Sequence, residues 1–151
     1  MQNVFDAKDA QEYINRINNL TPETQRKWGK MSVDQVLAHL NVAYDLTFMP
    51  EKFPKPSFIA KFLLSRFVKP KITNEIPYKP SLPTSPAFII ADERNFEEEK
   101  AKLIGNIQRV QQLGREAFEG KENINFGKMT AQGWNNMFAK HLNHHLEQFG
   151  V

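Results

Sequence analysis

The sequence of 151 residues contains no cysteine. This absence excludes a disulfide framework, thiolate metal ligands and a cysteine nucleophile. Unbroken apolar runs stay far below the length of about 18 residues that a transmembrane helix needs. Residues 1–6 show no basic region followed by an apolar run, so we expect no signal peptide and a cytoplasmic location.

A strong excess of charge of one sign is also lacking. Lysine and arginine number 20 against 17 aspartate and glutamate, which gives a formal net charge of +3. The basic residues are spread along the chain, so we expect no nucleic-acid partner. The length fits a single domain, residues 1–151, and a hydrophobic content of 40% can furnish its core.

Four stretches show helical periodicity, and none shows sustained strand alternation. Asp6 can cap the first, and Ser32 with Gln35 forms a capping box before the second. The expected helices cover about residues 6–20, 32–49, 92–118 and 130–149. The sequence therefore predicts an all-α fold, a four-helix bundle with one long crossover.

The crossover is rich in proline, because eight of the nine prolines lie between Pro50 and Pro86. One short helix is expected inside it, from Ser57 to about Val68, and it is apolar around most of its circumference. We expect it to lie across one end of the bundle as a lid. The alternative is a basic amphipathic helix on a membrane surface; the narrow polar edge of the segment favours the lid.

A five-residue motif occurs twice, as residues 28–32 (Trp-Gly-Lys-Met-Ser) and 126–130 (Phe-Gly-Lys-Met-Thr). Each copy ends on a hydroxyl residue that can cap a helix, and each precedes a helix that carries histidine. The match fits chance, a shared capping solution, or two related halves of a bundle.

Histidine occurs only four times, and three of the four lie in the run His141-Leu142-Asn143-His144-His145. Residues 141 and 145 stand one helical turn apart, a spacing that lets two imidazoles bind one metal ion. His144 also lies near the core-facing side, and spacing alone does not choose between it and His145. His39 lies on the apolar side of its own helix, which a bundle can bring opposite the run.

A plainer interpretation of these histidines exists. A single core histidine is more often held by a hydrogen bond than bound to a metal, and histidines near a helix C-terminus interact favourably with its dipole. Taken together, however, the inward-facing histidines fall on only two elements that a bundle can bring face to face. This combination favours a metal site.

Both histidine helices resemble those of a known superfamily. The pattern Ser32-x-x-Gln35-x-x-x-His39 and the ending His141-x-x-His144-His145 resemble the DinB-like (YfiT-like) superfamily, to which metalloenzyme activity is attributed. The two Gly-Lys-Met motifs and the ending His-Leu-Asn-His-His-Leu-Glu-Gln-Phe-Gly look most like a DinB-related family of small bacterial proteins. The resemblance covers nearly the whole chain and is weak only between residues 50 and 86.

This resemblance implies a four-helix bundle with an open three-histidine site for a divalent metal, typically nickel or zinc. The implied ligands are His39, His141 and His145, with His144 outside the ligand set. It also implies a metal-dependent transferase or hydrolase that acts on a small molecule, with a low-molecular-weight thiol as a further partner. The alternative is a non-catalytic metal- or ligand-binding bundle or an interaction module, and a homodimer is compatible with either.

Four more residues are candidates for the surroundings of the site. Gln35 lies one turn before His39 and is expected to donate a hydrogen bond near it. An apolar wall is expected one and two turns before His141, although aromatic residues at helical spacing are more often core; its members are Trp134, Met137 and Phe138. No carboxylate falls on the histidine face, so the nucleophile of a catalytic site would be a metal-bound water or thiolate.

Overall fold

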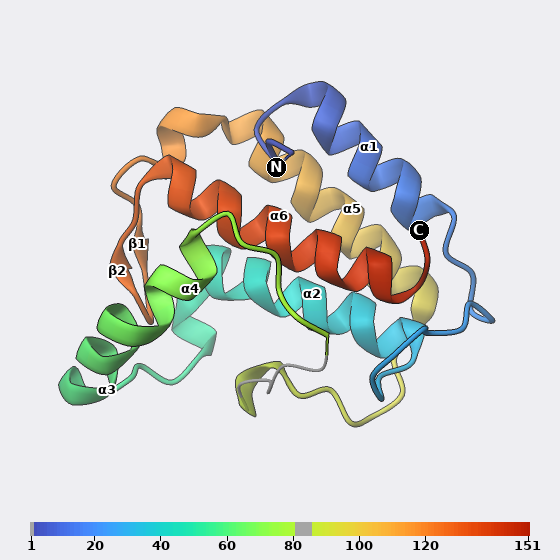
Figure 1. The fold of residues 1–151 in the computed structure, drawn as a ribbon, viewed down its shortest axis with the longest axis horizontal. Coiled ribbons are helices and arrows are strands. Elements are labelled where there is room, and N and C mark those ends of the chain that lie inside the picture. Colours follow the sequence, from blue (N-terminus) through green and yellow to red (C-terminus); the bar gives the residue numbers. More distant parts are fainter. Residues whose placement is uncertain (1, 81–85) are drawn as a thin grey trace.

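The computed structural model describes residues 2–80 and 86–151, and this part of the chain is mostly helical. Its four longer helices are α1 (Ala7–Asn18), α2 (Val33–Phe48), α5 (Phe96–Leu113) and α6 (Ala131–Gln148). Helix α6 runs through the middle of the molecule and contacts α1 and α2, while α5 packs against both α1 and α2 (Figure 1). The predicted all-α fold class is confirmed, because the described residues are mostly helical. No helix in the described ranges is long and apolar enough to cross a membrane.

The shorter elements come between α2 and α6 in the sequence. They are η1 (Pro50–Lys52), α3 (Phe58–Leu63), the π-helical η2 (Leu64–Val68), α4 (Lys69–Thr73), η3 (Pro86–Phe88), η4 (Arg115–Phe118), β1 (Glu122–Asn123) and β2 (Gly127–Lys128). The two strands form an antiparallel hairpin in a part of the chain for which the sequence predicted neither helix nor strand. Its turn is held by the Asn123 side chain, whose oxygen accepts hydrogen bonds from two backbone N–H groups further along the turn.

The predicted helix starts at Asp6, Ser32 and Thr130 are confirmed. Asp6 accepts from the backbone N–H of Lys8 at 2.9 Å, and Thr130 accepts from that of Gly133 at 3.1 Å. The Gln35 side chain accepts from the N–H of Ser32 at 3.0 Å, which is the reciprocal half of the predicted capping box. These bonds satisfy backbone groups that a helix end leaves without an internal partner.

The prediction for residues 92–118 was too long at both ends. Helix α5 begins only after Asn95, whose side chain caps it by accepting from the N–H of Glu98 at 3.2 Å. It ends at Gly114, where a φ of 72° turns the chain into the left-handed region. The residues that follow continue as the 3₁₀ helix η4, which packs against α6.

The crossover prediction was wrong in two respects, although its residues 81–85 lie outside the described ranges. The helix does not stop near Val68 but continues through η2 into α4, to Thr73. Pro70 has no N–H to donate within this stretch, and the wider π-helical turn directly before it lets the helical path continue. The N-terminal part of the expected lid also does not cover the bundle, since Phe58 is 87% exposed.

Aromatic residues from several elements form the centre of the core. The rings of Tyr44 on α2 and Phe138 on α6 stack with centroids 4.7 Å apart, and Trp134 lies 5.7 Å from Phe138. Phe118 of η4 meets Trp134 edge-on at 5.6 Å. All four side chains are buried, so they fix the relative positions of α2 and α6.

We predict that Phe138→Ala lowers the free energy of unfolding by about 3–5 kcal/mol, because it leaves a cavity among packed aromatic rings. Phe62→Ala is the matched control, since Phe62 is 60% exposed, and it should change stability by less than about 0.5 kcal/mol. Urea unfolding followed by circular dichroism measures both. Equal effects of the two substitutions would contradict the packing described above.

Candidate metal centre

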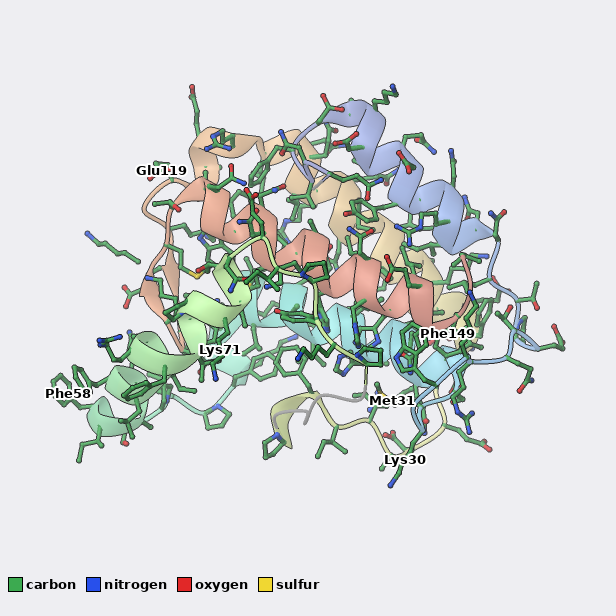
Figure 2. All side chains as sticks on the ribbon, in the orientation of Figure 1. Lys30, Met31, Phe58, Lys71, Glu119 and Phe149 are labelled. Atoms are coloured by element: carbon green, nitrogen blue, oxygen red, sulfur yellow. The ribbon has the colours of Figure 1, made fainter. Side chains whose placement is uncertain are left out.

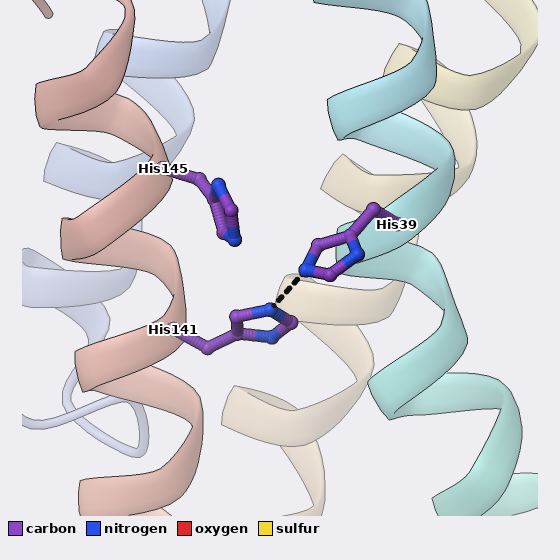
Figure 3. A group of neighbouring side chains, drawn as sticks. All are labelled: His39, His141 and His145. Atoms are coloured by element: carbon purple, nitrogen blue, oxygen red, sulfur yellow. Dashed lines mark hydrogen bonds between the residues drawn. The ribbon is translucent and has the colours of Figure 1, made fainter. Parts of the chain in front are cut away.

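Three histidines from two helices meet at one point inside the molecule. His39 is in α2, and His141 and His145 are one turn apart in α6. One ring nitrogen of each lies within 4.8 Å of one from each of the others. Figure 3 shows the three rings turned toward one another across the space between the two helices.

His39 is oriented by a backbone carbonyl. Its Nδ1 lies 2.7 Å from the carbonyl oxygen of Phe88 in η3. A carbonyl oxygen can only accept, so Nδ1 carries the proton and donates it. In the neutral ring Nε2 is therefore unprotonated, and it faces the other two histidines.

His145 is oriented by a side chain on its own helix. Its Nδ1 lies 2.8 Å from Oε1 of Gln148, and Nε2 of Gln148 donates to the carbonyl oxygen of Trp28 at 2.7 Å. The donation to Trp28 fixes the orientation of the amide, which leaves its oxygen to accept from His145. Nδ1 of His145 is therefore protonated and its Nε2 is free.

Gly29 makes this arrangement possible. Its φ of 84° suits glycine, and a Cβ atom at this position would collide with the Gln148 amide. The backbone N–H of Lys27 also donates to the carbonyl oxygen of Gln148, at 2.7 Å. The first copy of the repeated motif thus holds the end of α6.

His141 lies between the other two rings and is the partly exposed member of the group. Its Nε2 is 2.8 Å from Nε2 of His39, the dashed contact in Figure 3. Because Nε2 of His39 is unprotonated, His141 is the donor in this hydrogen bond. A cation that replaced this shared proton would meet three imidazole nitrogens.

All three rings are held in the neutral form. Burial lowers the pKa of His39, although its bond to the Phe88 carbonyl partly opposes this. Burial, and then the charge that His39 and His145 would carry, bring the pKa of His141 well below its usual value. Burial is also the main cause that lowers the pKa of His145, to about 3. Neutral imidazoles are the form that binds metals.

The cluster opens into a cavity of about 1390 Å³. Its wall is largely apolar, with Met31, Leu46, Ile72, Phe88 and Phe126 among the lining residues. No aspartate or glutamate lines the described part of the wall, whereas three lysines do: Lys30, Lys71 and Lys79. Such a cavity can hold a small organic molecule beside the histidines.

A family model described as "Protein of unknown function (DUF1569)" matches residues 2–150. The chain belongs to this family. No curated protein and no solved structure gives a significant match.

The predicted pocket residues divide into two groups. Met137 lines the cavity, as expected. Trp134 and Phe138 are buried in the aromatic core instead, and Nε1 of Trp134 donates to the carbonyl oxygen of Lys121 at 3.3 Å. Gln35 lines the cavity, but the amide nitrogen donates to the carbonyl oxygen of Asp92 at 3.3 Å rather than to a histidine.

His144 lies beside the cluster and outside it. Its ring centroid is 4.9 Å from that of His145, and aromatic rings flank it at 6.0 Å (Trp28) and 5.9 Å (Tyr78). It lines the cavity but is not a member of the three-histidine group. The exclusion of His144 from the ligand set, which the resemblance implied, stays a prediction.

Sequence reasoning missed two of the groups that orient the cluster. Phe88 acts through its backbone carbonyl, for which the side chain gives no signal. Gln148 follows His145 by three residues on α6, a spacing that could have indicated a hydrogen bond. Carboxylates are not part of the centre: Asp45 pairs with Lys102 at 2.7 Å, away from the cavity.

We predict that the metal-free protein loses stability as the pH falls from about 6.5 toward 3. The reason is that burial lowers the pKa of His145 to about 3 in the folded chain, so the unfolded chain takes up the proton first. His145→Gln removes this group and should flatten the pH dependence of the unfolding midpoint in the presence of a chelator. Identical pH profiles for the two proteins would show that His145 is not held neutral by folding.

Proposed function

We propose that the chain is a DinB-like four-helix bundle that binds one divalent metal ion through His39, His141 and His145. The observation that carries this proposal is the convergence of three neutral imidazoles whose ring nitrogens lie within 4.8 Å of one another. Nitrogen ligands of this kind suit zinc and nickel. The contacts among the four longer helices support the bundle.

The hydrogen bonds of the cluster also fit a metal centre. Ligating histidines in proteins almost always donate their second ring N–H to a carboxylate, a carbonyl oxygen or a water. His39 does so to Phe88 and His145 does so to Gln148, and both present a free Nε2 to the centre. Three protein ligands leave a coordination position open for a small molecule, as in catalytic rather than structural sites.

The function proposed for this centre is that of a metal-dependent transferase or hydrolase for a small molecule, with a low-molecular-weight thiol as the second partner. A divalent ion would supply Lewis-acid chemistry, which lowers the pKa of a thiol or water that binds to it. The apolar wall of the cavity would exclude water and hold an apolar or aromatic substrate. The cavity lysines would attract its negatively charged groups.

One observation favours the alternative, a non-catalytic metal- or ligand-binding bundle. The described cavity wall contains no carboxylate that could serve as a general base, and three of its four histidines belong to the cluster, with His144 alone outside it. The two functions differ in turnover, so thiol consumption by the metal-loaded protein with a simple aromatic electrophile separates them. A cytoplasmic location and a homodimer stay predictions.

Single substitutions of the four histidines should give a graded result. His39→Ala, His141→Ala and His145→Ala should each reduce bound metal to a small fraction, because two imidazoles hold an ion far more weakly than three. His144→Ala should retain most of it and serves as the matched control on the same helix. Elemental analysis of tag-free protein measures the stoichiometry, and circular dichroism checks that each variant folds.

Two outcomes of this series would contradict the proposal. Equal loss in all four variants would indicate another ligand set. Full retention of metal by folded His39→Ala would exclude a centre shared between α2 and α6.

Gln148→Ala should weaken metal binding by about 10–100-fold, because His145 loses the acceptor that orients its ring. Gln148→Glu should keep most of the affinity, since a carboxylate still accepts from Nδ1 of His145 while the donation to Trp28 is lost. Gln112→Ala, an exposed glutamine on α5, is the control. Competition with a metallochromic chelator measures all three, and equal weakening by the alanine and glutamate variants would show that Gln148 only holds the end of the helix.

A further inference from the structure

The helical segment α3–η2 exposes its apolar residues. Phe58 is 87% exposed, Ile59 71%, Phe62 60% and Phe67 59%. In Figure 2 the labelled Phe58 lies at the outer edge of the molecule, on the helix that extends furthest from the body. A helix on the surface of a protein ordinarily turns its polar face outward, so the opposite arrangement indicates a surface that another apolar medium covers.

The exposed apolar residues share one side of the helix. Phe58 and Phe62 are four residues apart, as are Ile59 and Leu63, and each such pair is adjacent on a helix surface. The partly buried residues Ala60, Leu64 and Ser65 lie toward the other side. The result is a continuous apolar ridge and not a set of scattered residues.

The charge of this region is mostly positive, and within the described ranges only Lys61 is paired, with Glu122 of β1 at 2.8 Å. Residues 52–74, which we call the docking segment, contain no acidic residue and six basic ones: Lys52, Lys55, Lys61, Arg66, Lys69 and Lys71. The whole chain carries only +3, so the rest of it is net negative. The positive charge of the protein is therefore concentrated around the apolar ridge.

The docking segment is fastened to the β-hairpin by Lys61, which pairs with Glu122 at 2.8 Å, and by Lys69, which donates to the carbonyl oxygen of Lys128 at 2.6 Å. Its C-terminal end is fastened to α6. The buried Lys140 of α6 donates to the carbonyl oxygen of Lys71 and to the Asn74 side chain, both at 2.7 Å. Asn136 donates to the carbonyl oxygen of Thr73 at 2.7 Å. These bonds hold α4 in place and leave the ridge on α3 free.

We propose that the docking segment binds peripherally to an anionic membrane surface, with the ridge inserted among the lipid chains and the basic residues against the head groups. Exposed phenylalanines flanked by lysine and arginine are the composition of interfacial helices. Each basic residue near an anionic surface strengthens binding by about fivefold. The inner side of the same segment lines the cavity through Leu64, Val68 and Ile72, so docking would bring the cavity close to the bilayer.

A second copy of the chain fits this surface less well. A symmetric dimer brings the same patch of each subunit together, and here it would place two sets of basic residues against each other. No acidic residue of the docking segment could compensate for this repulsion. An anionic lipid surface supplies both the apolar medium and the opposite charge.

The test is co-sedimentation of the full-length chain with mixed vesicles of phosphatidylserine and phosphatidylcholine. The chain should bind these vesicles, and added salt should weaken the binding. Binding to vesicles of phosphatidylcholine alone should be much weaker. Phe58→Ser combined with Phe62→Ser should reduce binding by about tenfold or more. Lys55→Glu combined with Arg66→Glu should reduce it by at least about 25-fold.

Matched variants outside the docking segment control for each change. Leu113→Ser replaces an exposed apolar residue of α5 and should leave binding nearly unchanged. Lys8→Glu combined with Lys27→Glu reverses two exposed charges and should reduce binding far less than the Lys55 and Arg66 variant does. Failure of the wild type to bind anionic vesicles would overturn the proposal. So would equal binding by the phenylalanine variant, or a dimer in light scattering that this variant abolishes, because a second copy would then cover the ridge.

Discussion

Two hydrogen bonds determine what the histidine cluster can do. The carbonyl oxygen of Phe88 and the amide oxygen of Gln148 are acceptors, and each accepts a hydrogen bond from the Nδ1–H group of one histidine. The Nε2 atoms of His39 and His145 are consequently unprotonated and face the same point. Without these acceptors the rings could rotate or change tautomer, and the cluster would be an ordinary set of buried polar groups.

Other parts of the structure hold the groups of these two hydrogen bonds in position. The positive φ of Gly29 lets the chain pass close to Gln148 and brings the Trp28 carbonyl to its amide. The aromatic core between α2 and α6 keeps His39 opposite His141 and His145. Burial of the rings keeps them neutral, at a cost in stability that a bound cation would offset.

Much of this could be predicted from the sequence, because its signals were local. Helical periodicity and capping residues located the longer helices, and the one-turn spacing of His141 and His145 placed them together. Helical spacing could not separate Met137, which lines the cavity, from Trp134 and Phe138, which do not. That distinction depends on where α2 and η4 lie, which spacing along one helix does not reveal.

The hydrogen bond from His39 to Phe88 and the exposure of the helix at Phe58 could not be predicted from residue spacing. A carbonyl such as that of Phe88 belongs to every residue, so its approach to His39 left no trace in the sequence. The apolar helix at Phe58 was expected to cover one end of the bundle because its polar edge is narrow, whereas the structure leaves Phe58 exposed. In each case the deciding contact, or its absence, involved segments far apart in the chain.

X-ray absorption spectroscopy of the tag-free protein loaded with nickel or zinc tests most directly whether His39, His141 and His145 bind a metal ion. A three-histidine centre should give one ion per chain with the multiple-scattering pattern of three imidazole rings, and with no sulfur ligand when no thiol is added. A spectrum dominated by oxygen ligands, without imidazole scattering, would contradict it, as would failure of the protein to retain either metal in stoichiometric amount.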